Sequence, residues 1–275
     1  MRIGVVAPAR TVSKEGSARM AAFMALTYPQ HDIVFHPQCY LTEGHFAGSD
    51  AVRAKAFLEF ANDPAIDAIW FARGGYGSNR ILEMVMPHLN NAAKHKTYMG
   101  FSDMGFLLAA LYARRIGLPV HASMASSMGK NDTGEAPGWA LGWLIDRDRR
   151  ALEPTLLDGR PAVALNLSIL TAMTGTPWMP DLTDHVLMIE EVGESMYRID
   201  RMLFTMAHAT QLKGVAGVRL GAVSDLVDND VEFGETLEQM MVRWCGEMGV
   251  PYLGRAEIGH VELNRVVPFG VTVKG

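Results

Sequence analysis

Short apolar runs alternate with amphipathic segments through about the first 125 residues of the chain. The runs that predict buried strands are residues 2–9, 31–36, 65–72, 96–101 and 118–124. The segments with helical spacing are residues 17–28, 49–63, 78–89 and 104–117. This alternation predicts parallel strands covered by helices, which is a doubly wound α/β sheet.

The pattern loosens after residue 125 and then becomes regular again. Residues 127–138, SMGKNDTGEAPG, are rich in turn formers and predict a loop or linker. A second α/β block follows from about residue 164, and its expected elements are a helix at 166–174, a strand at 185–191, a helix at 195–212, a strand at 214–223, a helix within 234–248 and closing strands that include 269–275. We therefore predict a domain at 1–128, a linker at 129–163 and a domain at 164–275.

Composition narrows the function classes. The net charge is −5 and the pI is about 6.0, which argues against nucleic acid as a main partner. No apolar run is long enough to span a bilayer or to form the core of a secretion signal, so we expect no membrane partner. Cys39 and Cys245 stand alone and are typical of free thiols in a reducing compartment. These features predict a cytoplasmic protein.

Ser102 is the first candidate for chemistry. It stands in GFSD, between a predicted strand and a predicted helix, where open α/β sheets bind their ligands. A sharp turn there can expose a serine side chain, and the amides of the following helix can face a developing oxyanion. Serine before a helix is also a common N-cap. From this stretch alone both roles stay open.

A glycine-rich turn is the second candidate. Arg73, Gly74, Gly75 and Gly77 follow the strand at 65–72, and consecutive glycines let a backbone approach a ligand closely. The spacing fits neither of the usual phosphate-binding glycine motifs. An oxyanion or carboxylate site and a plain tight turn are both compatible with it.

Carboxylates and histidines complete the set. Glu190 and Glu191 end a predicted strand, and a buried carboxylate there would need a partner such as a histidine. His260, in EIGHVEL, is one candidate for a general base, and His121, in LPVHASM, is a rival. No sequence motif for a metal site is present, so we expect no metal and no cofactor.

These segments together resemble the LD-carboxypeptidases, a serine peptidase family that includes muramoyl-tetrapeptide carboxypeptidases and microcin C immunity hydrolases. The matching segments are IGVVAPA, ARGGYGSNRIL, GFSD, NLSIL followed by TGTPWMP, IEEVGESMYRIDRML and IGH, and they span nearly the whole chain. The resemblance implies an N-terminal domain like that of class I glutamine amidotransferases and a C-terminal α/β domain.

The resemblance also implies roles for residues. Ser102 would be the nucleophile, Glu190 and His260 the other members of a Ser–Glu–His triad, and the backbone N–H groups of Gly75 (or Gly74) and Asp103 the oxyanion hole. Glu191 stands where the family usually has Asp.

Substrate contacts are expected from four residues. Arg73 or Arg201 would hold the substrate carboxylate, and Gly74 and Asn166 would lie in the substrate cleft. Asn166 belongs to a departure, because the chain has ALNL where relatives have GGNL. This departure concerns substrate choice and spares the triad.

Three functions are weighed. The main hypothesis is a cytoplasmic serine carboxypeptidase that removes a terminal D-amino acid from a small peptide, with murein tetrapeptide in cell-wall recycling as the implied substrate and a homodimer as the implied assembly. The second keeps the triad but cleaves peptidyl-nucleotide toxins, for which Trp139 and Trp143 are base-stacking candidates; their four-residue spacing also suits core packing. The third is a non-catalytic module that binds a small anion.

Overall fold

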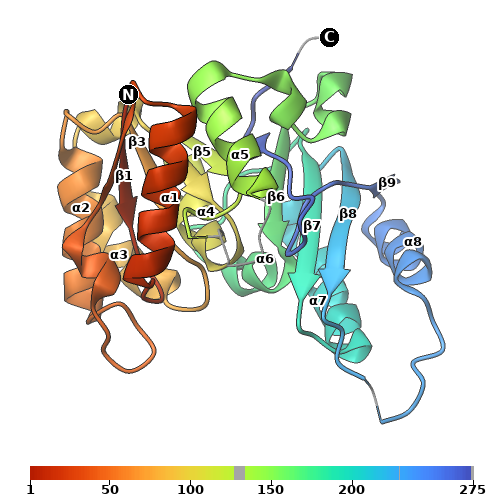
Figure 1. Ribbon diagram of the computed structural model, residues 1–275. Helices are drawn as coiled ribbons and strands as arrows, with labels where there is room; N and C mark the ends of the chain where they lie inside the picture. The colour runs from red at the N-terminus through yellow and green to blue at the C-terminus, as the bar shows by residue number, and fades with distance from the viewer. Residues whose placement is uncertain (127–133, 229, 274–275) are drawn as a thin grey trace.

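A computed structural model describes residues 1–126, 134–228 and 230–273 and contains two sheets side by side (Figure 1). The sheet of the N-terminal half has six strands in the order β10-β5-β4-β3-β1-β2, and the second has four in the order β6-β7-β8-β9. All pairs are parallel except β10 with β5. The predicted doubly wound parallel sheet with a second α/β unit is confirmed.

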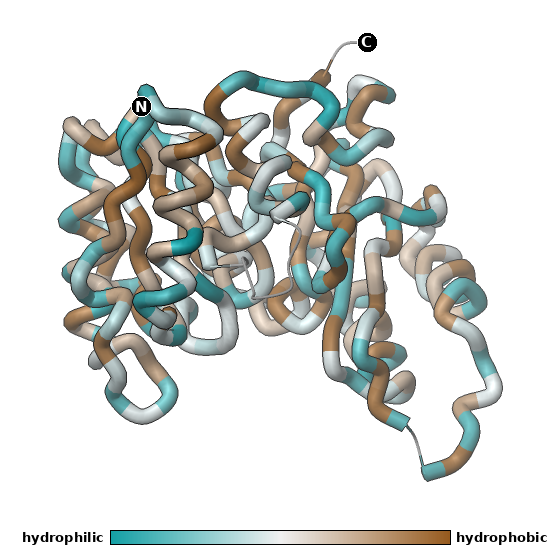
Figure 2. The backbone as a smooth tube through the Cα atoms, in the orientation of Figure 1, coloured by the Kyte–Doolittle hydropathy of each residue, from teal (hydrophilic) through white to brown (hydrophobic). Residues whose placement is uncertain are grey.

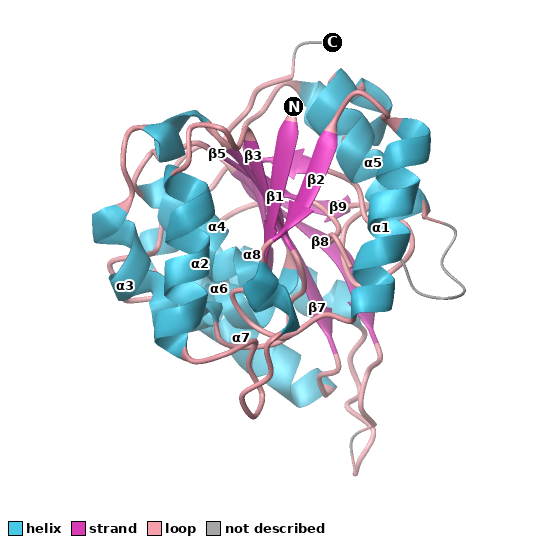
Figure 3. Cartoon of the chain, turned by 60° about the vertical axis from the view of Figure 1, so that its left-hand side comes forward, coloured by secondary structure: helices cyan, strands magenta, loops and turns pink. Residues whose placement is uncertain are grey.

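The strands are short and most are buried. Their bounds are β1 Arg2–Val6, β2 Asp32–Phe35, β3 Ala68–Phe71, β4 Thr97–Gly100, β5 Leu118–His121, β6 Ala162–Asn166, β7 Val186–Val192, β8 Gly217–Ser224, β9 Tyr252–Arg255 and β10 Val267–Pro268. The helices are α1 Lys14–Thr27, α2 Asp50–Asn62, α3 Leu82–Val85, α4 Gly105–Ala113, α5 Glu135–Leu141, α6 Leu167–Met173, α7 Met196–His208 and α8 Leu237–Met248. Figure 3 shows helices on both sides of the strands.

The apolar pattern explains why these elements pack as they do. Strands β3 and β4 are buried on both faces, which accounts for their nearly continuous apolar runs. Trp70 and Tyr98 are among the largest fully buried side chains. In Figure 2 brown segments lie inside the molecule and teal segments lie at several of the outer turns.

Two buried apolar clusters each contain residues of both sheets. Helix α4 of the first unit packs on α6 of the second, where a side chain at Gly105 would lie 3.1 Å from Leu165 and Ile169. The buried cluster runs from Phe57 and Phe71 beneath the first sheet to Leu187 and Leu220 in the second. The two halves are therefore held by core packing as well as by the chain that joins them.

Strand β10 carries the end of the described chain back to the first sheet. It leaves the second sheet after β9 and pairs with β5, with Val267 opposite His121. The next residue, Phe269, is 2 % exposed and donates its backbone N–H to the Pro119 carbonyl at 3.0 Å. The loop between β9 and β10 is thus fixed at both ends, once on each sheet.

Some predicted elements were wrong. Residues 78–89 are not one helix but two 3-10 turns around the short α3, which ends shortly before Pro87 because proline lacks the N–H that would continue the helix. The closing strand predicted at 269–275 does not form in its described residues. The last strand is instead Val267–Pro268, and the chain turns at Gly270 with φ +69°. Residues 127–133 of the predicted linker and residues 274–275 lie outside the described residues.

Two further points concern organisation. We propose residues 1–128 and 164–275 as the two domains along the sequence. In space the division differs, because β10 lies in the second segment but extends the first sheet. Within the described ranges, every helix is too short or too polar to cross a membrane.

Phe269 tests how the β9–β10 loop is anchored. Its ring lies in the core and packs edge-on against the ring of Tyr112, with 5.8 Å between the ring centres. We expect Phe269→Ala to lower the free energy of unfolding by about 3–5 kcal/mol, because it opens a cavity that the packed core cannot refill. Urea denaturation measures this. Val242→Ala, at a valine that is 61 % exposed on α8, is the control and should change stability little; equal effects of the two variants would contradict the anchoring.

Candidate active site

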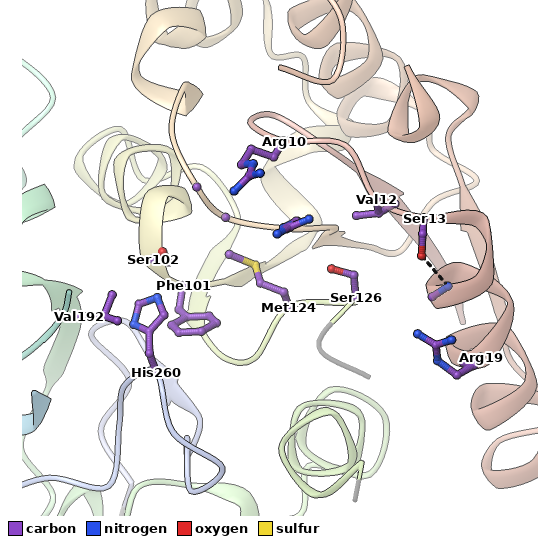
Figure 4. Close-up of a pocket in the computed structure, with 14 residues that line it drawn as sticks. Arg10, Val12, Ser13, Arg19, Phe101, Ser102, Met124, Ser126, Val192 and His260 are labelled. Atoms are coloured by element: carbon purple, nitrogen blue, oxygen red, sulfur yellow. Dashed lines mark hydrogen bonds between the residues drawn. The ribbon is translucent and has the colours of Figure 1, made fainter. Parts of the chain in front are cut away.

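Several strands of the first sheet end around one cavity of about 590 Å³. Arg10 follows β1, Arg73 and Gly74 follow β3, Ser102 follows β4 and Met124 follows β5. The carboxyl ends of parallel strands are where open α/β sheets bind ligands. Figure 4 shows that His260 enters the same cavity beside Ser102 and Phe101.

Ser102 has an unusual backbone for a serine. Its φ is +56°, in the left-handed region that residues other than glycine seldom adopt. It begins the 3-10 turn Ser102–Met104 that leads into α4, and neither this turn nor α4 has a side-chain capping bond at its start. The hydroxyl is therefore not used to cap the helix that it precedes. The turn instead exposes it to the cavity, where N–H groups at the helix start lack partners within the helix.

Gly74 lies directly against Ser102. A side chain there would bring its Cβ to 3.0 Å from both Cβ and Oγ of Ser102. Gly75, with φ +117°, and Gly77, with φ +129°, have conformations that strain other residues. The glycines are thus required by close approach to Ser102 and by backbone conformation.

Asp103 ties this glycine turn to the helix of Ser102. Its carboxylate accepts the N–H groups of Ser78 at 2.9 Å and Gly77 at 3.3 Å, and its carbonyl accepts the Ser78 hydroxyl at 2.6 Å. Burial raises the pKa of Asp103, while these hydrogen bonds act in the opposite direction. Sequence analysis singled out only the backbone of Asp103 and missed the role of its side chain.

Arg53 supports the same turn from α2. Its guanidinium is buried and donates to the Gly77 carbonyl at 2.9 Å, and it also contacts the Pro8 carbonyl and Asp50. Its position on the buried face of an amphipathic helix was a signal that sequence analysis did not use. An arginine on such a face needs several acceptors nearby.

Glu190 and His260 form a buried pair. The Glu190 carboxylate is fully buried in β7, and its Oε2 lies 2.8 Å from His260 Nδ1. A ring nitrogen facing a carboxylate carries a proton, which leaves Nε2 to face the cavity. The centre of the Phe101 ring lies 4.7 Å from the centre of the His260 ring, and this contact limits rotation of the imidazole. His260 and Ser102 line one cavity, and Glu190 lies behind His260, so three distant segments meet here.

His121, the rival histidine, occupies a different setting. It is fully buried, and its Nε2 lies 2.8 Å from Asn264 Oδ1. Burial lowers the pKa of His121. It does not line the cavity, so it has no access to a substrate there.

Asn264 was missed by sequence analysis, and no motif marks it. Besides His121, its Oδ1 accepts the N–H of Gly259 at 3.0 Å. Gly259 precedes His260 and has φ +131°. A single amide oxygen thus fixes the turn that carries His260.

Asn166 and Arg201 lie away from the cavity that Ser102 lines. Asn166 is buried, accepts the N–H groups of Ser168 and Ile169 at the start of α6, and donates to Glu191 at 2.9 Å. Arg201 is exposed on α7, with its guanidinium 5.6 Å from the ring centre of Tyr197. Of the four expected substrate contacts, only Arg73 and Gly74 line the cavity.

The remaining sequence candidates carry no further chemistry at this site. Cys39 and Cys245 are buried free thiols whose pKa burial raises, to about 12 for Cys39 and about 11 for Cys245. In the part of the chain that the structure describes, no three His, Cys, Asp or Glu side chains are grouped to hold a metal ion.

The Gly259 amide offers a direct test of Asn264. We expect Asn264→Ala to speed hydrogen exchange of that amide about tenfold or more, because a lost hydrogen bond of about 1.4 kcal/mol corresponds to a factor of ten. Exchange followed by NMR or mass spectrometry measures it. Glu262→Ala, at an exposed position of the same loop, is the control. Unchanged exchange in Asn264→Ala would show that the turn does not depend on this side chain.

Glu191 gives a pH test. Burial is the main cause that raises its pKa, against hydrogen bonds from Val192, Asn166 and Ser168. Because its pKa is raised by folding, Glu191 keeps its proton to higher pH in the folded state than in the unfolded state. Its contribution to the free energy of unfolding is therefore complete below the ordinary pKa of 4.5 and is lost as the pH rises through the pKa of the folded state. In Glu191→Gln this fall should disappear, so its stability should depend less steeply on pH. Urea denaturation from pH 4 to pH 8 measures both slopes, and equal slopes would contradict the assignment.

Sequence comparison identifies both halves of the chain. The LD-carboxypeptidase N-terminal domain matches residues 3–122, and the LD-carboxypeptidase C-terminal domain matches residues 161–274. A protein of Synechocystis sp., provisionally named a carboxypeptidase, is 30 % identical over 87 % of this chain and 80 % of its own. The murein tetrapeptide carboxypeptidase of Pseudomonas aeruginosa is 25 % identical over 98 % of this chain and 92 % of its own.

Solved structures agree in fold. The muramoyltetrapeptide carboxypeptidase of Oxalobacter formigenes has a TM-score of 0.82 at 22 % identity, covering 98 % of this chain and 93 % of its own. The microcin C7 self-immunity protein MccF has a TM-score of 0.80 at 18 % identity, covering 98 % and 91 %. At these identities the likeness concerns the fold, while the two domain matches span most of the sequence. The chain belongs to the LD-carboxypeptidase family and is a peptidase.

Proposed function

We propose that this protein is a serine carboxypeptidase that releases the terminal D-alanine of murein tetrapeptides during cell-wall recycling. The observation that carries the proposal is the buried Glu190–His260 pair, which opens onto the same cavity as Ser102. Relatives and a structural neighbour named for murein or muramoyl tetrapeptides support the substrate.

The proposed mechanism follows from the positions of the three side chains. Ser102 Oγ attacks the carbonyl carbon of the scissile amide, and His260 Nε2 accepts the serine proton. Glu190 holds His260 by Nδ1 and stabilises the imidazolium that forms. His260 then gives the proton to the leaving amine of D-alanine, and water hydrolyses the acyl-enzyme in the second half of the reaction.

The developing oxyanion needs donors near Ser102. The proposed donors are the backbone N–H groups of Gly75 and Asp103, each worth about 3 kcal/mol in comparable enzymes. Support comes from the Asp103 carboxylate, which holds the glycine turn to the start of the helix that Ser102 begins. Donors held in place in this way do not need to reorganise when negative charge develops on the carbonyl oxygen.

Arg73 is the proposed anchor for the terminal carboxylate. It lines the cavity one residue before Gly74, which lies against Ser102. An arginine can hold a carboxylate by two parallel hydrogen bonds. This would place the bond before the last residue at Ser102, as a carboxypeptidase requires. Gly74 serves by leaving room, whereas Asn166 and Arg201 are assigned no contact with the substrate.

The second function, cleavage of peptidyl-nucleotide toxins, rests on structural likeness to MccF, one form of which is in complex with glutamyl sulfamoyl guanosine. The tryptophans considered for base stacking pack against arginines instead. The Arg147 Cζ lies 4.4 Å from the ring centre of Trp143, and the Arg265 Cζ lies 4.1 Å from that of Trp139. Neither lines the cavity. The murein peptide is therefore the substrate proposed here, and the cytoplasmic location and the homodimer stay predictions.

Ser102→Ala tests the proposal. The wild type should release D-alanine from murein tetrapeptide, and Ser102→Ala should lower kcat/KM at least about a thousandfold, because loss of a triad nucleophile costs that much or more. Ser126→Ala is a matched control, since Ser126 lines the same cavity but donates its hydroxyl to the Ala72 carbonyl at 2.6 Å. A coupled D-alanine assay measures both variants.

Two outcomes would decide against the proposal. If wild type and Ser102→Ala were equally inactive on the peptide while both bound it, the protein would be a binding module. If the wild type cleaved aspartyl sulfamoyl adenosine but not the tetrapeptide, the toxin function would replace the murein one. Labelling of wild type but not of Ser102→Ala by a fluorophosphonate would separately establish the nucleophile.

A further inference from the structure

His121 lies where the strand that leads to Ser102 and the returning end of the chain meet. It ends β5, and in the sheet its neighbours are Gly100 of β4 on one side and Val267 of β10 on the other. Its side chain is buried. A polar ring in such a place needs a hydrogen-bond partner inside the protein, because burial without one is costly.

The partner of His121 fixes which ring nitrogen carries the proton. The backbone N–H of Gly259 can only donate, so the Asn264 atom that it meets at 3.0 Å must be the amide oxygen. His121 Nε2 lies 2.8 Å from the same oxygen and must therefore donate to it as well. Burial lowers the pKa of His121, which favours the neutral ring with its proton on Nε2.

Asn264 joins the first sheet to the turn before His260. Its side chain is buried, and its Nδ2 has no hydrogen-bond partner among the described residues. The amide oxygen instead accepts from both His121 and Gly259. An amide that is buried with its donor unpaired costs free energy, so this side chain is best explained by the two segments that its oxygen holds together.

Backbone pairing holds the loop of His260 only at a distance. Residues 261–266 lie between His260 and Val267, where β10 begins. A closer contact comes from the ring of Phe101, whose centre lies 4.7 Å from that of His260 and 5.6 Å from that of His121. The first sheet thus reaches the imidazole through side chains, and His121 takes part in both contacts.

We propose that His121 is a positioning residue for the general base: it donates from Nε2 to Asn264, which holds the turn of Gly259. This hydrogen bond sets the approach of His260 to Ser102. The inference rests on the proposed function, in which His260 removes the serine proton. His121 does not line the cavity, so its loss should slow the chemical step and leave peptide binding largely unchanged.

Two substitutions at residue 121 isolate this hydrogen bond. Glutamine carries an amide nitrogen as many bonds from Cβ as Nε2 of histidine, so His121→Gln can still donate to Asn264. In His121→Asn the nitrogen is one bond closer to Cβ and falls short. Both variants lose the ring that packs on Phe101, so the difference between them reports the donor. With murein tetrapeptide, His121→Asn should lower kcat about tenfold or more at little changed KM, whereas His121→Gln should keep most of the wild-type kcat.

Three controls separate positioning from a general loss of stability. Val120→Ala, at the buried neighbour of His121 on the opposite face of β5, should lower stability in urea but leave kcat unchanged. In an Asn264→Ala background His121→Asn should have little further effect on kcat, because the route through Asn264 is already broken. If His121→Asn does not fold, His121→Met, which fills the space without a donor, takes its place.

Three kinetic results would overturn the inference. His121→Gln might be as slow as His121→Asn, which would show that the donor does not matter. Val120→Ala might lower kcat as much as His121→Asn, which would show a general effect of destabilisation. The effects of His121→Asn and Asn264→Ala on kcat might multiply, which would show that His121 does not act through Asn264.

Hydrogen exchange separates this inference from the proposed function. The Gly259 amide should exchange about tenfold faster or more in His121→Asn than in the wild type, and nearly as slowly as the wild type in His121→Gln. A wild type that released no D-alanine would overturn the proposed function, while these exchange rates would still decide whether His121 fixes the turn. Equal exchange in all three proteins would overturn the inference even if the peptide were cleaved.

Discussion

A fully buried carboxylate must find a partner, and this requirement organises the site. Glu190 sits inside β7 with no access to solvent, and His260 supplies its hydrogen bond. Leaving such a charge unpaired costs several kcal/mol, so the pair holds the His260 loop against the second sheet. The pairing of β10 with β5 then holds the same loop to the first sheet. The imidazole is positioned by electrostatics on one side and by backbone pairing on the other.

The other half of the site is held by hydrogen bonds within the first sheet. Ser102 and the glycine turn follow neighbouring parallel strands, β4 and β3, and the Asp103 carboxylate joins the two segments. Arg53 holds the turn from the opposite side. The proposed nucleophile and its proposed oxyanion donors thus form one rigid unit. The approach of His260 to that unit depends on how the two sheets pack through α4 and α6.

Local patterns predicted much of this architecture. The alternation of apolar runs and amphipathic segments predicted the doubly wound sheet, and GFSD, RGGYG, IEEVGE and IGH predicted which residues to compare. The rest depends on long-range contacts that no single segment encodes. Nothing around Asn264 indicates that it would hold the Gly259 amide, and Asn166 and Arg201 occur in suggestive segments although neither faces the cavity. The end of α3 shortly before Pro87 was predictable from the sequence, because proline lacks the N–H that would continue the helix.

The return of β10 has a consequence for biosynthesis. Ser102, the proposed nucleophile, is made early, whereas His260 and the strand that anchors its loop are made much later. A growing chain, or one cut before residue 260, has Ser102 and its glycine turn but lacks His260, the proposed base. The proposed triad is in this way complete only after both sheets have assembled.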